Sequence, residues 1–323
     1  MTSIYKKICL SVGFGALVFL GFSVYLDVDE LRGAFARFDW WAMVFALLLA
    51  LSNYGIRFLR WERYLDLLSI EMERPDSLRV FLSGLVLSVT PGKAGELMKA
   101  VLVRQRTGTP VGVTSAAVFA ERLTDFVGLT LLSLVGIVSF REGVLTLVVA
   151  TAGSAALLLL VFWPGALRGT LALVGRLPGL GRLADPLGQA YEGARLLLSP
   201  VPFLQGLGLA VAAWFAECVG LYVVLAGFGH DIGVVASTFI YAFATIFGAL
   251  TFVPGGLGAT EGSMAALLGF SGVGIESAVA ATLLIRVCTL WFAVLLGGLV
   301  LVRSGFASET ISDTTPMIEI ECE

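Results

Sequence analysis

Residues Ser88 to Arg106 read SVTPGKAGELMKAVLVRQR, and they decide the fold because an apolar run breaks at Pro91-Gly92 and restarts as a charged helix. Proline lacks the amide donor and clashes with the preceding turn, while glycine adopts backbone angles that other residues avoid. The restarted helix begins near Lys93, and its unpaired amide N–H groups attract anions, more strongly with a lysine beside them. This stretch is either a cytoplasmic loop between two membrane helices or part of a binding site.

The composition places the chain among integral membrane proteins. Hydrophobic residues make up 58% of it and charged residues 14%, against roughly 45–50% and 25% in a soluble domain. Several apolar runs approach the roughly 20 residues that a helix needs to cross a bilayer, and the alternation typical of an outer-membrane barrel is absent. We therefore expect an all-α polytopic membrane protein. With a net charge of −3 and no basic tract with interleaved aromatics, nucleic acid is not an expected partner.

The cysteines and the single histidine give no sign of a metal site or a disulfide. Cys9, Cys218 and Cys288 lie in apolar runs and Cys322 lies in the polar tail, without a paired spacing. Such cysteines usually act as small hydrophobic residues in helices. His230 lies in the polar segment GFGHDIG, so we expect it in a loop. No cofactor and no metal are predicted.

The distribution of positive charge predicts the orientation of the chain. Lys6 and Lys7 precede an apolar run from Ile8 to Leu26, which is longer than the core of a secretory signal and lacks an obvious cleavage site. We interpret it as a first membrane span that leaves from a cytoplasmic N-terminus, because short cytoplasmic loops collect lysine and arginine. Five further full spans are predicted over Trp40 to Arg60, Val113 to Phe140, Val144 to Trp163, Phe203 to Gly227 and Ala278 to Leu301.

Two arginines at the end of the second span leave two interpretations open. Arg57 and Arg60 either face a polar cavity or extend from a helix end toward solvent. The last span ends at Arg303, which puts the C-terminus in the cytoplasm by the same charge rule. A multi-pass protein of the cell membrane is therefore expected.

Residues 78–106 are too short to cross the bilayer twice. The arm from Leu78 to Thr90 has about a dozen residues and reaches only mid-membrane at 1.5 Å per residue. The second arm carries Arg104 and Arg106 back to the cytoplasmic side. A re-entrant hairpin satisfies both constraints, provided that surrounding helices shelter its non-helical backbone. A second hairpin, over residues 234–272, breaks within Pro254 to Gly262 (PGGLGATEG) and enters from the opposite side.

The two breaks belong to a predicted internal repeat. Glu96 follows the first break and Glu261 the second, and an arginine, Arg122 or Arg286, comes roughly 25 residues after each glutamate. The spans that start at Trp40 and Phe203 also precede their breaks by a similar distance of roughly 51 residues.

The halves are expected to be inverted, because the first begins in the cytoplasm and the second begins outside. The predicted units are residues 1–142 and 143–303, followed by a disordered cytoplasmic tail over residues 304–323. Inverted repeats with broken helices that meet at mid-membrane are typical of transporters.

Three motifs carry a resemblance to a known family. TPGKAGELMKAVLVRQRTG from Thr90, ERLTDF from Glu121 and PGGLGATEG from Pro254 are similar to the transmembrane flippase region of lysylphosphatidylglycerol synthases and to stand-alone proteins with that region. The similarity covers Lys6 to Arg303. It implies a lipid translocator that moves a phospholipid or a polyprenyl-linked lipid between leaflets. Only about twenty polar residues follow Arg303, so the aminoacyl-transferase domain of the bifunctional members, and lysine transfer, are not expected.

A lipid translocator needs charges that shelter a headgroup. Lys93 and the amides after Pro91-Gly92 are candidates to hold a phosphate, with Arg122 and Arg286 as further cations. The buried acids balance these cations, bind an amine-bearing headgroup, take up protons, or form permanent ion pairs that hold the bundle together. The predicted substrate-binding residues are Pro91, Gly92, Lys93, Glu96, Lys99, Glu121, Arg122, Asp125, Glu217, Pro254, Gly255, Gly256, Glu261 and Arg286.

The sequence also bears on the energy source and on rival functions. Gly92-Lys93 lacks the spacing of an ATP-binding phosphate loop, which leaves proton coupling, with Glu96 or Glu261 titrating, or downhill movement. A lipid-modifying enzyme is a rival interpretation, although no HExxH or GxSxG motif is present. A membrane scaffold is another, but it would leave costly buried charges unused.

Overall fold

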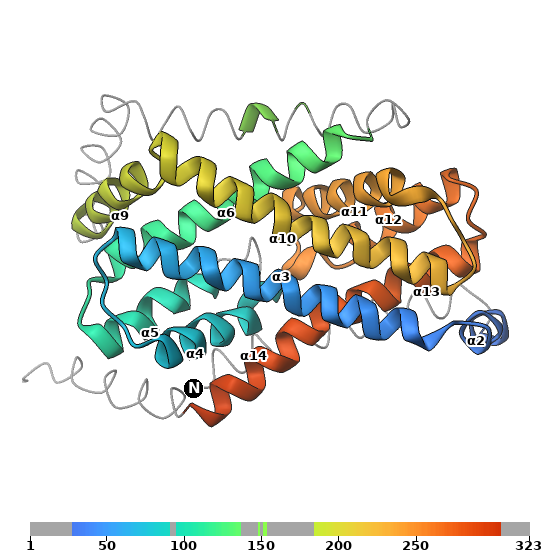
Figure 1. Ribbon diagram of the computed structural model, residues 1–323, viewed down its shortest axis with the longest axis horizontal. Helices are drawn as coiled ribbons and strands as arrows, with labels where there is room; N and C mark the ends of the chain where they lie inside the picture. Colours follow the sequence, from blue (N-terminus) through green and yellow to red (C-terminus); the bar gives the residue numbers. More distant parts are fainter. Residues whose placement is uncertain (1–27, 91–94, 137–147, 149–150, 154–183, 305–323) are drawn as a thin grey trace, which may run out of the picture.

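The computed structural model describes residues 28–90, 95–136, 148, 151–153 and 184–304, and every element assigned in these ranges is helical (Figure 1). Four helical segments are long and apolar enough to cross a membrane: α3 (Trp40–Leu67), α10 (Pro200–Gly227), α11 (Gly233–Leu250) and the last span, Ile275–Arg303. This confirms the all-α polytopic membrane fold. The span predicted over Ile8 to Leu26, most of the one over Val144 to Trp163 and the tail 305–323 lie outside the described residues, so the total of six stays a prediction.

Helices α3 and α10 run antiparallel and lie side by side through the centre of the molecule (Figure 1). At one end the backbone N–H of Asp39, the N-cap of α3, donates to the carbonyl of Gly227 at 2.9 Å. Near the middle, Asn53 Nδ2 donates to the carbonyl of Ala213 at 2.8 Å. A Cβ at Gly227 would come within 2.6 Å of Ala42, so the absence of a side chain there lets the two helices approach.

The second span is longer than its sequence suggested. Helix α3 continues past Arg60 to Leu67, and Arg57 and Arg60 are buried within it rather than placed at a helix end. An additional helix, α2 (Val28–Ala36), lies in the connection before α3, between the first two predicted spans. The helix over the third predicted span, α6, is Val111–Leu134.

Two helical hairpins enter the molecule from opposite ends of its long axis (Figure 1). The first consists of α4 (Arg74–Leu85), the 3₁₀ turn η1 (Val86–Val89) and α5 (Met98–Thr107), with residues 91–94 of its break outside the described residues. The second consists of α11, the 3₁₀ turn η5 (Pro254–Gly256) and α12 (Ala259–Phe270). The turns η1 and η5 contact each other, so the breaks meet in the interior.

Glycines shape the second break. Gly255, Gly256 and Gly258 have φ angles of 63°, 66° and 85°, a left-handed backbone that glycine adopts without steric cost. The side chain of Glu261 then caps the new helix, because its Oε2 accepts a hydrogen bond of 2.6 Å from the N–H of Gly258. Phe252, just before the break, holds a φ of 54°, which is strained for an aromatic residue.

The last span has a joint between two α-helices. Helix α13 (Ile275–Arg286) and helix α14 (Phe292–Arg303) are connected by a single π-helical turn, Val287–Trp291. Helix α13 packs on α12 and α10, whereas α14 packs on α4 and η1. The last span therefore contacts both hairpins. Helix α9 (Ala184–Leu197) packs on α6 at the end where the first hairpin enters.

Candidate functional site

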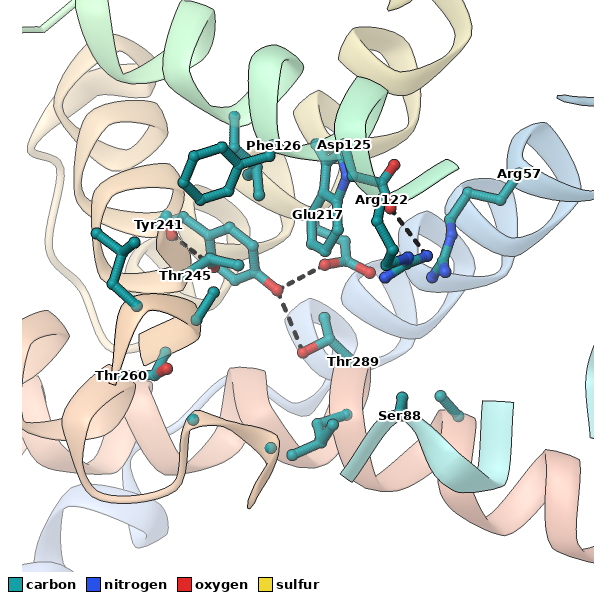
Figure 2. Close-up of a pocket in the computed structure, with 18 of the residues that line it drawn as sticks. Arg57, Ser88, Arg122, Asp125, Phe126, Glu217, Tyr241, Thr245, Thr260 and Thr289 are labelled. Carbon is teal, nitrogen blue, oxygen red and sulfur yellow. Dashed lines mark hydrogen bonds and ion pairs between the residues drawn. The ribbon is translucent and has the colours of Figure 1, made fainter. Parts of the chain in front are cut away.

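A cavity of about 460 Å³ lies where the two hairpin breaks meet, enclosed by α3, α6, α10, α11 and the last span. We call it the central cavity. Its volume is within the range of sites that bind small molecules or headgroups. Most of its lining is apolar, and its charged lining residues are Arg57, Arg122, Asp125, Glu217 and Arg286. Figure 2 shows the first four of them directed toward the same part of the cavity.

Arg57, on α3, is a buried cation with no carboxylate at ion-pair distance among the described residues, although the charges of Asp125, Glu96, Glu121 and Glu217 act on it from farther away. Its residue is only 7% exposed, and its guanidinium makes no hydrogen bond or ion pair within the described part of the chain, with Nε wholly unsatisfied. The Trp214 ring lies 6.0 Å from its guanidinium carbon, at the outer limit of a cation–π contact. A buried charge in this condition is costly unless a partner arrives. An anionic ligand in the cavity would be such a partner.

Arg122, on α6, is held loosely between two carboxylates. Its Nη2 lies 3.1 Å from Glu96 Oε2 and 3.0 Å from Asp125 Oδ2. Neither contact has hydrogen-bond geometry, and its Nε also lacks an acceptor among the described residues. Its side chain is 23% exposed. The donors of Arg122 are therefore able to turn toward a ligand. Arg122 and Asp125 are three residues apart on α6, a spacing at which side chains on one helix meet.

Asp125 also joins α6 to α3. Its Oδ1 lies 2.7 Å from Arg60 Nη2, and Arg60 Nη1 donates to Thr124 Oγ1 at 3.1 Å. The side chains of Arg60 and Asp125 are almost fully buried. This well-formed pair fixes one wall of the central cavity.

Glu217 belongs to a chain of hydrogen bonds across the cavity (Figure 2). The hydroxyl of Tyr241, on α11, donates to Glu217 Oε2 at 2.6 Å, and it also lies 3.3 Å from Thr289 Oγ1. The hydroxyl of Tyr54, on α3, donates to the carbonyl of Thr289 at 2.5 Å. Thr289 lies within the π-helical turn, so this turn is tied directly to α3 and α11, and through Tyr241 to α10.

Two of the predicted residues pair away from the cavity. Lys99 Nζ, on α5, forms a fully buried ion pair with Glu121 on α6. The ammonium also lies 4.4 Å from the centre of the Trp61 ring, a favourable cation–π arrangement. Gly84 makes room for the lysine stem, because a Cβ there would meet Lys99 Cγ at 2.6 Å. The pair holds the first hairpin against α6.

A third pair, Arg286 with Glu261, lies beside the second break. Arg286 Nε is 2.6 Å from Glu261 Oε1, and Arg286 Nη2 donates to the carbonyl of Gly255 at 2.7 Å. Arg286 lines the cavity while Glu261 lies behind it, fully buried. The guanidinium is therefore more tightly held than those of Arg57 and Arg122.

The structure brings part of the predicted set together. Six predicted residues line the central cavity: Arg122, Asp125, Glu217, Gly255, Gly256 and Arg286. Glu96 and Glu261 contact the cavity arginines from outside the lining, and Pro254 begins the second break. Pro91, Gly92 and Lys93 lie outside the described residues. None of these placements tests binding, which stays a prediction.

Some cavity residues were missed or left open by the sequence. Arg57 was left open because α3 was expected to end near it. Tyr54, Tyr241 and Thr289 had no motif to mark them. One signal was available: Tyr54 and Arg57 are three residues apart, as are Trp214 and Glu217, and this spacing puts each polar group on one helix face.

Comparisons with known proteins point to a single family. The profile described as "Lysylphosphatidylglycerol synthase TM region" matches residues 8–297. Two similar proteins, both described as UPF0104 membrane proteins, come from Methanothermobacter thermautotrophicus. One is 22% identical over 316 residues, covering 90% of this chain and 94% of the relative. The other is 26% identical over 305 residues, covering 88% and 89%.

Proposed function

The chain belongs to the family of the lysylphosphatidylglycerol synthase transmembrane region, and from this membership and the charged central cavity we propose that it is a lipid flippase. Its substrate is a phospholipid or a polyprenyl-linked lipid, whose phosphate binds in the cavity during passage between leaflets. The observation that carries the proposal is the guanidinium of Arg57, buried in the cavity wall with no anion paired to it in the described structure. A phosphate between Arg57 and Arg122 would supply the missing charge.

The apolar part of the lining suits a lipid rather than a free anion. Phe119 and Phe252 line the cavity and are also exposed on the molecular surface, Phe252 by 71%. A cavity of this size holds a headgroup-sized molecule, so the hydrocarbon tails remain outside it. Exposed aromatic residues at the rim give those tails an apolar path into the bilayer.

The ion pairs beside the two breaks support an inverted repeat. Glu96 pairs with Arg122 after the first break, and Glu261 pairs with Arg286 after the second. Each pair joins the helix after a break to the next helix along the chain, as two copies of one unit would. We propose repeats over residues 1–142 and 143–303.

The hairpins then have defined sides in the membrane. In this proposal α4 and α5 re-enter from the cytoplasm and α11 and α12 from outside, and both chain termini are cytoplasmic. Because the hairpins meet at the central cavity, an exchange of their conformations would open the cavity first to one leaflet and then to the other. Irregular backbone at this depth is tolerated only where protein surrounds it, as it does at η1 and the buried Gly256 of η5.

The test is translocation by purified protein in vesicles. Acyl-labelled phosphatidylglycerol, phosphatidic acid and phosphatidylethanolamine, and a labelled short-chain polyprenyl phosphate, would be bleached from outside with dithionite. We expect wild type to expose inner-leaflet label of at least one phosphate lipid, and Arg57→Gln to slow this at least tenfold. Arg79→Gln is the matched control, because Arg79 is exposed and paired with Asp76.

Two outcomes separate the rival classes. A wild-type protein that behaves like protein-free vesicles for every lipid would contradict translocation and favour a scaffold. A change in the mass of the lipid after incubation would favour an intramembrane enzyme.

A further inference from the structure

The walls of the central cavity differ in how far they are exposed. The lining residues on α3, on α10 and on the first hairpin are all buried. The exposed lining residues are Phe119 on α6, Ala249 on α11, Phe252 just after α11, and Gly153 in the segment 151–153. In the part of the chain that the structure describes, the cavity therefore reaches the molecular surface between α6 and the second break.

Helices α6 and α11 pack together at the ends away from this exposed side. A Cβ at Gly136, just after α6, would come within 2.4 Å of Phe239, near the start of α11. Phe119 lies toward the other end of α6, and Phe252 follows the other end of α11. The two phenylalanines therefore flank an opening of the cavity, which we call the lateral portal.

One face of α6 at the lateral portal combines apolar groups with a cation. Phe119, Arg122 and Phe126 are three and four residues apart, so they follow each other along one helix face, and all three line the central cavity. Figure 2 shows Arg122 and Phe126 extending from α6 toward the cavity. The side chain of Arg122 is partly exposed, whereas Arg57 is buried. A phosphate that enters through the lateral portal therefore meets Arg122 before Arg57.

Phe252 has an unfavourable backbone conformation at the lateral portal. Its φ of 54° lies in the left-handed region, which bulky side chains disfavour. The residue is mostly exposed, so packing within the protein does not offset this cost. Strained residues of this kind cluster at functional sites, where the strain serves the mechanism. A hydrocarbon chain that lies on the ring would give the strained conformation such a function.

We propose that the lipid enters the central cavity sideways through the lateral portal, with its phosphate at Arg122 and a hydrocarbon chain against Phe252. The inference rests on the proposed function, and it adds the route of the lipid and a positioning residue for its chain. Exposed phenylalanine rings bind a ligand by burying apolar surface, which a free phosphate does not have. The ligand is therefore a phosphate that carries hydrocarbon chains.

Photolabelling of the wild-type protein tests the route. The probe is phosphatidylglycerol with a diazirine in its acyl chain, close to the glycerol, added to the protein in dodecyl maltoside micelles. The reference probe is diacylglycerol with the same chain, which lacks the phosphate. We expect the peptides that contain Phe119 and Phe252 to be labelled at least threefold more by the phospholipid than by the reference. Peptides with Phe45 on α3 and Phe215 on α10, two exposed phenylalanines outside the cavity lining, should be labelled equally by both probes.

Substitutions at Phe252 separate contact with the lipid from backbone strain. Phe252→Gly removes both the ring and the strain, so its melting temperature should not fall below that of wild type. Its translocation of phosphatidylglycerol should slow about fivefold, which corresponds to the loss of roughly one buried CH₂ contact. Phe252→Leu keeps an apolar side chain and should restore most of the rate.

Ser69→Gly is the matched control. Ser69 is exposed and has a φ of 55°, but it lies outside the lining of the central cavity. The substitution relieves the same kind of strain, so it should not lower the melting temperature, and it should leave translocation unchanged.

The possible failures are distinguishable. Equal labelling by both probes at Phe119 and Phe252, or unchanged translocation by Phe252→Gly, overturns the lateral portal and leaves the flippase proposal standing. A Phe252→Leu variant as slow as Phe252→Gly overturns the contact between this side chain and the lipid. If Phe252→Gly fails to fold, the photolabelling of wild type decides. A wild-type protein that translocates no phosphate lipid contradicts the proposed function itself.

Discussion

Arg57 and Arg60 are three residues apart on α3, and their surroundings give them opposite roles. Arg60 is fully buried against Asp125 and Thr124, so it stabilises the contact between α3 and α6. Arg57 has no such partner in the described ranges, so its burial carries an energetic cost that a ligand offsets. A residue that lowers stability while serving a site is a common feature of functional positions.

This difference predicts unequal effects of the same substitution. Arg60→Met should lower the free energy of unfolding by about 3–5 kcal/mol, because it leaves Asp125 buried without its main cation. Arg57→Met should cost less stability than Arg60→Met, because carboxylates act on Arg57 only from a distance and no ion pair in direct contact is broken. Unfolding of both variants in detergent micelles by dodecyl sulfate titration would measure this. Arg57→Met at least as destabilised as Arg60→Met would show that Arg57 is paired in the native protein.

At the residue scale the sequence predicted contacts within a helix but not those between helices. The pair of Arg122 and Asp125 follows from spacing on one helix. The pair of Lys99 and Glu121 depends on how α5 packs on α6, and no local pattern contains that information. The sequence did not decide whether Arg57 is buried, because three arginines within seven residues are as typical of a solvent-exposed helix end as of a buried helical turn.

At the scale of helices, the contact of α14 with α4 depends on one glycine. A Cβ at Gly297 would come within 2.5 Å of the carbonyl oxygen of Leu82 and 2.8 Å of the backbone nitrogen of Val86. Both obstacles are backbone atoms, which do not move aside without shifting the hairpin. A Cβ at the next residue, Gly298, would have its nearest neighbour at 3.6 Å.

We therefore expect Gly297→Ala to destabilise the protein by about 1–3 kcal/mol and to loosen the first hairpin. Gly298→Ala is the control, with an effect near zero apart from its gain in helix propensity. Thermal unfolding in detergent, followed by circular dichroism, would compare the two. Equal melting temperatures would mean that α14 and α4 are not packed as closely as described.

The helices themselves were largely predictable, because Pro-Gly breaks and apolar runs have direct physical meaning. The second break appears where PGGLG predicted it, with positive φ angles at its glycines. Two features were not predictable. Helix α3 extends past its arginines because neighbouring helices bury them, and the π-helical turn has no sequence signature.

At the scale of the whole molecule, the hairpins predict which loops share a side of the membrane. Leu78 on α4 and Arg104 on α5 are exposed, and these two helices of the first hairpin lie toward one end of the molecule (Figure 1). Asp231, just before α11, and Phe270, at the end of α12, are exposed, and these two helices of the second hairpin lie toward the other end (Figure 1). A re-entrant arrangement puts each pair on a single side.

Single cysteines at these four positions, in a variant without the native cysteines, would test the topology. A membrane-impermeant sulfonate reagent should label Leu78→Cys and Arg104→Cys from the cytoplasmic side only. It should label Asp231→Cys and Phe270→Cys from the outside only. Labelling of Leu78→Cys and Arg104→Cys from opposite sides would rule out both the hairpin and the inverted repeat.

The inverted repeat predicted from the sequence implies that the two breaks meet at one cavity. It does not predict which side chains line that cavity. The sequence suggested fourteen residues on the grounds of charge and motif. Among those that the structure describes, the packing distinguishes the loosely held Arg122 from tightly paired charges such as Lys99 with Glu121 and from the backbone turn at Pro254–Gly256. Only three-dimensional placement separates Arg122, whose Nε and Nη2 make no hydrogen bond within the described structure, from Arg286, whose Nε and Nη2 both have acceptors.

The π-helical turn at Val287–Trp291 determines how the helix face that contacts the second hairpin is rotated relative to the face that contacts the first. Such a turn holds one residue more than an α-helix needs, so α14 is rotated by about 100° from the course that α13 would have followed. Helix α13 presents its face to α12, and α14 presents Gly297 to α4. The number of residues in the π-helical turn therefore determines the angle at which one hairpin meets the other. Adding or removing one residue in this turn would rotate α14 so that Gly297 no longer faces α4, without changing the amino-acid composition of either helix.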